Sequence, residues 1–127
     1  MMAYLNSEPV AQEVRHALRR AQKNEILLFF TLINYGECMY IIEREKGTEE
    51  AQRAANIIDQ LPLRVVPADR PLVFEAAHLK ARYPISYADA FAAAAAKQHG
   101  GRVMTGDLEF KAVEPEVAIH WLPARRK

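Results

Sequence analysis

Apolar residues recur at two spacings along the chain, and their alternation predicts helices separated by short strands. Over residues 10–21 the apolar positions fall three or four residues apart, as on the buried face of a helix, and Ser7 precedes them as a candidate cap. Residues 26–30 are apolar at every position, which is typical of a short strand buried on both faces. A helix over residues 32–46 follows, and Gly47 is well placed to end it.

The same alternation continues to the C-terminus. Thr48 and Asp69, both common helix-capping residues, precede helical patterns that extend to about Leu61 and Tyr83. Ser86 is a further such cap, before an alanine-rich helix that ends at two glycines. Short apolar runs at residues 63–66, 102–105 and 117–122 predict the remaining strands. Strands separated by helices favour an α/β domain with a mostly parallel sheet flanked by helices.

Size and composition are those of one ordinary domain. The chain has 127 residues, half of them apolar (50%), which is enough for a continuous core. Seventeen Lys and Arg against sixteen Asp and Glu give a net charge of +1, too balanced to indicate nucleic-acid binding through bulk charge alone. Cys38 is the one cysteine, so an internal disulfide is excluded, and its apolar neighbours predict a buried thiol. Because no membrane span or signal-peptide pattern is found, we expect a single cytoplasmic domain over residues 1–127.

Several kinds of catalytic site are disfavoured by what the chain lacks. The four histidines and the cysteine have no ligand spacing, which argues against a zinc site. The two serines, Ser7 and Ser86, both precede helices and are expected to be caps rather than nucleophiles. No phosphate-binding loop or dinucleotide-binding glycine pattern occurs. An aspartate that would mark a receiver-like domain is missing after the first predicted strand.

Three carboxylates stand in unusual settings. Asp107 directly follows the third predicted strand, at the edge of the sheet where α/β domains place their chemistry, although an ordinary turn also uses Asp there. Glu37 lies in an apolar segment of the helix after the first strand, where exposure at the edge of the buried stripe is the alternative. Asp89 lies in the first turn of the helix that Ser86 caps, a position that the helix dipole also favours.

These three acids can form one metal site. If the first and third strands are neighbours, Glu37 and Asp107 converge at one edge, and the start of the Ser86 helix brings Asp89 beside them. Clustered carboxylates repel one another unless a cation neutralises them. Oxygen-only ligands select Mg²⁺ or Mn²⁺, ions that can activate a water for in-line attack on a phosphodiester.

The chain resembles PIN-domain ribonucleases, and in particular the VapC toxins of bacterial and archaeal toxin–antitoxin pairs. The segments that carry the resemblance are Ile85-Ser86-Tyr87-Ala88-Asp89-Ala90, Val103-Met104-Thr105-Gly106-Asp107-Leu108-Glu109-Phe110, Asn34-Tyr35-Gly36-Glu37, Val65-Val66-Pro67 and Ala3-Tyr4-Leu5-Asn6-Ser7-Glu8-Pro9. The resemblance implies a PIN-like three-layer sandwich over essentially the whole chain. It also implies that Glu37, Asp89 and Asp107 are ligands of a divalent metal and that Thr105 lines the same catalytic site. An RNA substrate, a cognate antitoxin protein and a homodimer are further implications.

One feature departs from the family pattern. The family normally opens with a strand that ends in an aspartate followed by Ser or Thr, and Met1 and Met2 stand in that place. The strand is central in the family's sheet, so we expect a domain truncated at its N-terminus, with unpaired strand edges.

Two interpretations follow from the acids and this departure. The leading one is a Mg²⁺-dependent endoribonuclease, the toxin of a toxin–antitoxin pair, in which Asp89 and Asp107 hold the ion and Glu37 either orients the attacking water or supports the ion through a water. The alternative is a catalytically impaired remnant that binds a protein partner. Two groups of basic residues are candidates for binding RNA or are simply solvated surface: Arg15, Arg19, Arg20 and Lys23, and Lys80, Arg82, Lys97, Arg102 and Lys111.

Overall fold

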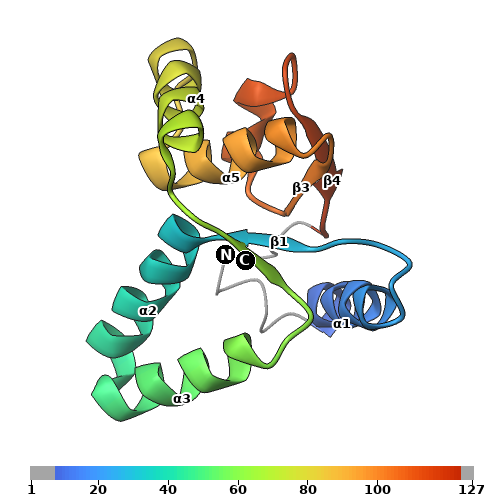
Figure 1. Cartoon of the computed structure of the whole chain (residues 1–127), viewed down its shortest axis with the longest axis vertical. Coiled ribbons are helices and arrows are strands. Elements are labelled where there is room, and N and C mark those ends of the chain that lie inside the picture. The colour runs from blue at the N-terminus through green and yellow to red at the C-terminus, as the bar shows by residue number, and fades with distance from the viewer. Residues whose placement is uncertain (1–7, 124–127) are drawn as a thin grey trace.

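Helices and short strands alternate along residues 8–123, the part of the chain that the computed structural model describes (Figure 1). The order is α1 (Glu8–Gln22), β1 (Phe29–Thr31), α2 (Leu32–Lys46), α3 (Thr48–Asp59), β2 (Arg64–Val66), α4 (Arg70–Arg82), α5 (Tyr87–Gln98), β3 (Arg102–Thr105), the 3-10 helix η2 (Leu108–Val113) and β4 (Ala118–Trp121). The predicted α/β order of elements is confirmed.

The strands are parallel, but they form two separate pairs. β1 pairs with β2, with Thr31 opposite Val66, and β3 pairs with β4, with Thr105 opposite Trp121. Within residues 8–123 no strand pairing joins β1 to β3, so the first and third predicted strands are not hydrogen-bonded neighbours in one sheet. The physical reason is that β1 and β3 each pack against α5, and no described strand lies between them. Their inner edges therefore have no strand partner in this part of the chain, as the resemblance led us to expect.

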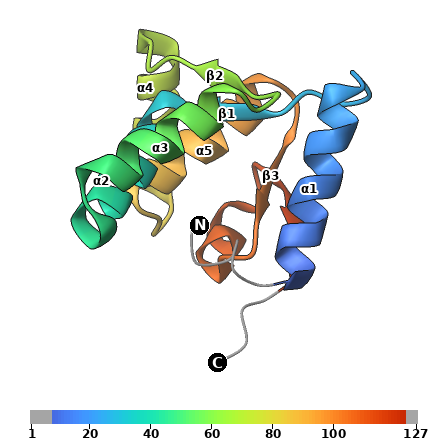
Figure 2. The ribbon, with the colours of Figure 1, turned by 90° about the horizontal axis from the view of Figure 1, so that it is seen from below.

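Helices lie on both sides of the β3–β4 pair. Figure 2 shows α1 on one side of β3 and α5 on the other. On the first side, the His120 ring of β4 lies 3.3 Å from the Glu13 carboxylate of α1. This layering agrees with the predicted α/β sandwich. Among the described helices, none combines the length and the apolar character that a bilayer crossing requires.

The core lies where α4, α5 and the β3–β4 pair meet. Its buried residues are Leu72, Ala76, Leu79, Ile85, Ala90, Phe91, Ala93, Ala94, Ala95, Val103, Phe110, Val113 and Val117. Because α5 contributes mainly alanines, its neighbours can approach its axis closely. Cys38 of α2 is also buried, as predicted, and burial raises the pKa of its thiol. The well-packed α5 thus provides a fixed base for the residues at its first turn.

Most helix caps are those predicted. The side chains of Asp69 and Ser86 accept backbone N–H bonds at the starts of α4 and α5. Two boundaries differ. Thr31 ends β1 and also caps α2, because its hydroxyl accepts the Asn34 N–H at 3.0 Å, so the strand runs later than residues 26–30. The N-cap of α3 is Gly47, at a φ of 94°, and not Thr48 as predicted. Thr48 is the first residue of the helix, and no side chain caps it. The predicted cap at Ser7 lies outside the described residues.

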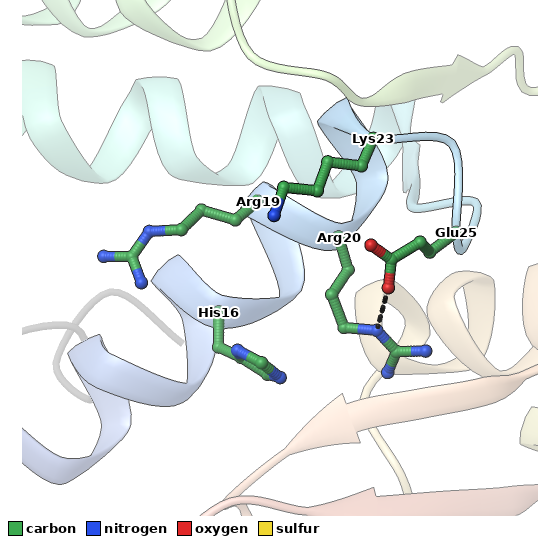
Figure 3. Close-up of a pocket in the computed structure, with 5 residues that line it drawn as sticks. All are labelled: His16, Arg19, Arg20, Lys23 and Glu25. Carbon is green, nitrogen blue, oxygen red and sulfur yellow. Dashed lines mark ion pairs between the residues drawn. The ribbon is translucent and has the colours of Figure 1, made fainter.

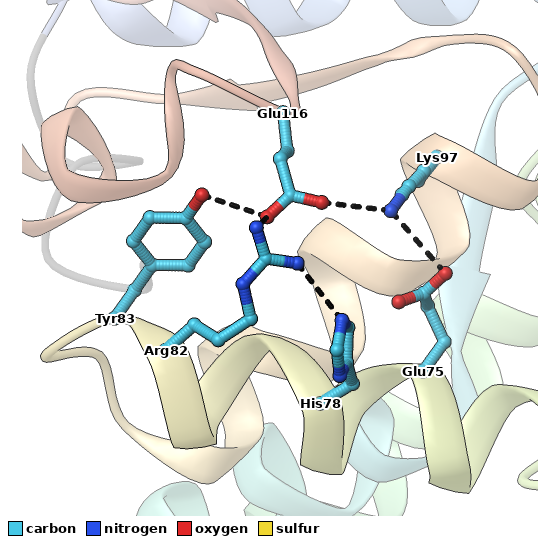
Figure 4. Close-up of polar contacts among 6 residues, drawn as sticks. All are labelled: Glu75, His78, Arg82, Tyr83, Lys97 and Glu116. Atoms are coloured by element: carbon cyan, nitrogen blue, oxygen red, sulfur yellow. Dashed lines mark hydrogen bonds and ion pairs between the residues drawn. The ribbon is translucent and has the colours of Figure 1, made fainter.

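A polar network fastens the segment after η2 to α4 and α5 (Figure 4). The Glu116 carboxylate accepts the Tyr83 hydroxyl at 2.7 Å and the Lys97 ammonium at 2.9 Å, and it pairs with the Arg82 guanidinium at 2.8 Å. These donors, the Tyr83 hydroxyl first, lower the pKa of Glu116 to about 2. Lys97 also pairs with Glu75 at 3.5 Å. The network holds the connection between η2 and β4 against the core helices.

Candidate metal centre

Asp107 is held at the end of β3 by its immediate neighbours. Its backbone N–H donates to the Thr105 hydroxyl at 3.0 Å, and its carboxylate accepts the Glu109 N–H at 2.9 Å as the cap of η2. Thr105 is only 3% exposed, so it lies beneath the turn. The structure thus gives the Thr105 hydroxyl a definite task, which is to fix the backbone that carries Asp107.

Asp89 lies in the first turn of α5 and is half-buried. Its backbone N–H donates to the Ser86 hydroxyl at 3.1 Å, which fixes the start of the helix. The pKa of the Asp89 carboxyl is raised to about 6, first by burial and then by the negative charge of Glu109, with smaller contributions from Asp107 and Glu37. Nearby negative charges disfavour the ionised form of Asp89, and a cation bound beside it would stabilise that form.

Glu109 is the acid that the sequence analysis missed. Its carboxylate accepts the Ser86 N–H at 2.6 Å, which ties η2 to the start of α5. Carboxylate oxygens of Asp89, Asp107 and Glu109 all lie within 4.8 Å of one another, and we call these three residues the acid cluster. Glu109 stands two residues after Asp107 in the segment that carries the family resemblance, but only the tight turn after β3 brings the two side chains together.

Glu37 lies beside the acid cluster without being part of it. It is half-buried on α2, outside the set of oxygens within 4.8 Å, yet its charge contributes to the raised pKa of Asp89. The approach of α2 is set by Asn34, whose side-chain amide donates to the Ala88 carbonyl at 3.0 Å. Of the three acids predicted from the sequence, the structure thus brings Asp89 and Asp107 together. Glu37 lies outside the cluster but close enough for its charge to act on Asp89.

The acid cluster has the donor set of a site for a hard divalent cation. Among residues 8–123, no lysine, arginine or histidine forms an ion pair with any of the three carboxylates. The cluster therefore keeps its mutual repulsion unless a cation is bound. Its candidate ligands are all oxygens, which favours Mg²⁺ or Mn²⁺ over metals that prefer nitrogen or sulfur.

Comparison with known proteins agrees with this geometry. The family model of the PIN domain matches residues 1–115, which is most of the chain. PIN domains are generally metal-dependent nucleases, so the match supports a hydrolase that acts on nucleic acid. A search of curated proteins gives no match. With the α/β layering and the acid cluster already established, the extent of the family match shows that the chain belongs to the PIN domain family.

Proposed function

We propose that this protein is an endoribonuclease that uses Mg²⁺ or Mn²⁺ held by the acid cluster. The observation that carries the proposal is the meeting of Asp89, Asp107 and Glu109 at the end of β3, without a basic partner in the described chain. When bound there, the ion supplies an activated water and stabilises the charge that develops on the phosphodiester.

The residues of the chain divide the remaining tasks. Asp107 is held in place by the Thr105 hydroxyl beneath its turn, and Asp89 by the Ser86 cap, so both present their oxygens at fixed positions. Glu37, which lies on α2 outside the acid cluster, orients the attacking water by accepting a hydrogen bond from it. Asn34 is a positioning residue, because its bond to the Ala88 carbonyl sets how far Glu37 stands from Asp89.

The finer parts of the proposal rest on the resemblance to VapC toxins. They are an RNA substrate, a role as the toxin of a toxin–antitoxin pair, neutralisation by a cognate antitoxin, and a homodimer. Expression of the chain in a bacterial host tests the toxin role: growth arrest that requires Asp89 and Asp107 supports it. Normal growth at a verified expression level of active nuclease contradicts it.

A cleavage assay tests the enzymatic proposal. The full chain is incubated with single-stranded RNA, and with DNA of the same sequence, in Mg²⁺, Mn²⁺ or EDTA. We expect cleavage of RNA in either metal, none in EDTA, and losses of at least a hundredfold in Asp89→Asn and Asp107→Asn. Glu45→Gln, an exposed acid on α2, is the matched control and keeps full activity. Cleavage that survives EDTA and both aspartate substitutions contradicts the proposal.

A further inference from the structure

The C-terminal half of α1 and the turn that follows it carry a row of exposed basic side chains, which we call the basic strip: Arg15, Arg19, Arg20 and Lys23. Arg15, Arg19 and Lys23 follow one another at intervals of four residues, so they line one face at a spacing of about 6 Å along the axis. Lys23 continues the helical turn, since its N–H donates to the Arg19 carbonyl at 3.1 Å. The strip is therefore a linear array of positive charge rather than a scattered set.

Part of this charge is not neutralised within the described chain. Arg20 pairs with Glu25 at 3.5 Å, whereas no carboxylate of residues 11–123, whose side chains the structure describes, forms an ion pair with Arg19 or Lys23. The second basic group considered from the sequence differs. There Arg82 and Lys97 are bound by Glu116, and Lys80 donates to the Ile85 carbonyl. Arg102 and Lys111 of that group form no ion pair within the described residues either, but the group is spread over α4, α5, β3 and η2, whereas the strip is confined to α1 and the residue that follows it.

The surface around the strip is open and polar. His16, Arg19, Arg20, Lys23 and Glu25 line one shallow hollow, with no apolar side chain among them (Figure 3). Arg15 and Arg19 also line a second hollow, between α1 and residues 60–62, where Leu18, Leu61 and Pro62 add apolar surface. Protein interfaces usually centre on a buried aromatic or apolar anchor, and arginine is common in them, whereas nucleic-acid interfaces are polar and carry several positive charges side by side, as the first hollow does. The composition of the strip favours a phosphate backbone over a protein partner.

We propose that the basic strip binds the phosphate backbone of the RNA that the acid cluster cleaves, at a position remote from the cut; this inference rests on the proposed function. Figure 2 shows the C-terminal end of α1 and the orange segment that follows β3, which contains η2, at opposite ends of β3. The 15 residues of α1 span about 22 Å, so an RNA must run along the domain to engage both sites. The strip therefore selects long strands over short ones.

Binding measured without cleavage tests the strip. Fluorescence anisotropy in EDTA follows an RNA strand of about 20 nucleotides over a salt series. We expect Arg19→Gln/Lys23→Gln to bind the strand several-fold more weakly, with a salt slope shallower by about 1.4 for two lost contacts to a single strand. The double variant Arg44→Gln/Lys46→Gln removes two charges from the last turn of α2 and is the matched control, with wild-type binding.

The outcomes separate the strip from the metal centre. We expect the strip variant to cleave a tetranucleotide at the wild-type rate, because so short a substrate reaches only the acid cluster, and to cleave the long strand more slowly at limiting concentration. Wild-type affinity and salt slope in the strip variant overturn the inference. So does displacement of the RNA by polyglutamate at an equal charge concentration, which identifies a surface for acidic protein. If the wild-type chain cleaves no RNA but its RNA binding still depends on Arg19 and Lys23, the proposed function is rejected and the strip inference is not.

Discussion

The backbone N–H of Ser86 donates to the Glu109 carboxylate at 2.6 Å, joining two segments that are 23 residues apart in the chain. Ser86 caps α5, which carries Asp89, and Glu109 lies in η2, which Asp107 caps. This one bond therefore links the two elements that present the acids. Glu109 has a double role: one of its oxygens closes the link, and its charge belongs to the acid cluster.

The two roles of Glu109 can be separated by substitution. Glu109→Gln keeps an oxygen that can accept the Ser86 N–H but removes the charge, so we expect at least about tenfold weaker Mn²⁺ binding with little change in melting temperature. Glu109→Ala removes both, and we expect its melting temperature to fall by a few degrees as well. Differential scanning fluorimetry and a metal titration check both effects. Equal Mn²⁺ affinity in wild type and Glu109→Gln would remove Glu109 from the site.

The pKa of Asp89 predicts how the metal-free protein responds to pH. Because the folded-state pKa is about 6, above the ordinary value of 3.8, the folded state binds the proton more tightly than the unfolded state does. The free energy of unfolding therefore falls as pH rises from about 4 to about 6. In EDTA at pH 7.5 we expect Asp89→Asn to melt a few degrees above wild type, and the difference to vanish below pH 4. An Asp89→Asn variant less stable than wild type at pH 7.5 would contradict this.

The same proton competes with the metal. A carboxyl must be deprotonated to bind a cation, so metal affinity should fall as pH drops through about 6, by about tenfold per pH unit below it. Cleavage at limiting Mg²⁺ should follow the same curve, and saturating Mg²⁺ should shift it to lower pH. A pH series of activity at two Mg²⁺ concentrations measures the shift. An apparent pKa near 4 that does not respond to Mg²⁺ would show that Asp89 does not bind the ion.

Glu116 makes the opposite prediction for stability. Its folded-state pKa, about 2, lies below its ordinary value of 4.5, so its contribution to stability is present above pH 4.5 and is lost as pH falls toward 2. We expect Glu116→Gln to lower the melting temperature by a few degrees at pH 7 and to approach wild type below pH 3. Thermal melts over pH 2–8 test this, with Glu43→Gln, an exposed acid on α2, as the control. A stability difference that does not depend on pH would mean that the charge of Glu116 is unimportant.

Local patterns were enough to predict two of the three acids. Asp89 is placed by the cap at Ser86, and Asp107 by the end of an apolar strand, and both signals lie within a few residues of the acid itself. The position of the Glu109 side chain depends on a tight turn and on a hydrogen bond to the distant Ser86 backbone. Hydrophobic periodicity gives no sign of either. The position of Glu37 depends on how α2 packs beside α5, through the bond from Asn34 to the Ala88 carbonyl.

The same distinction applies to the fold. Parallel strands between helices could be predicted, because alternating elements with long connections favour that arrangement. The division into two sheets could not be predicted from local patterns. Whether β1 and β3 are neighbours depends on what lies between them, and the two strands share only their packing on α5. The boundary between β1 and α2 lies later than the apolar pattern predicts. The reason is local: the Thr31 hydroxyl caps α2, and a count of apolar positions does not include it.

Mn²⁺ binding tests most directly whether Asp89, Asp107 and Glu109 share one divalent cation. Electron paramagnetic resonance or calorimetry counts the ions bound by the full chain at pH 7.5. We predict one tight Mn²⁺ per chain, displaced by Mg²⁺, and no tight ion in the triple variant Asp89→Asn/Asp107→Asn/Glu109→Gln. Unchanged Mn²⁺ binding in the triple variant, or none in the wild type, would contradict the account.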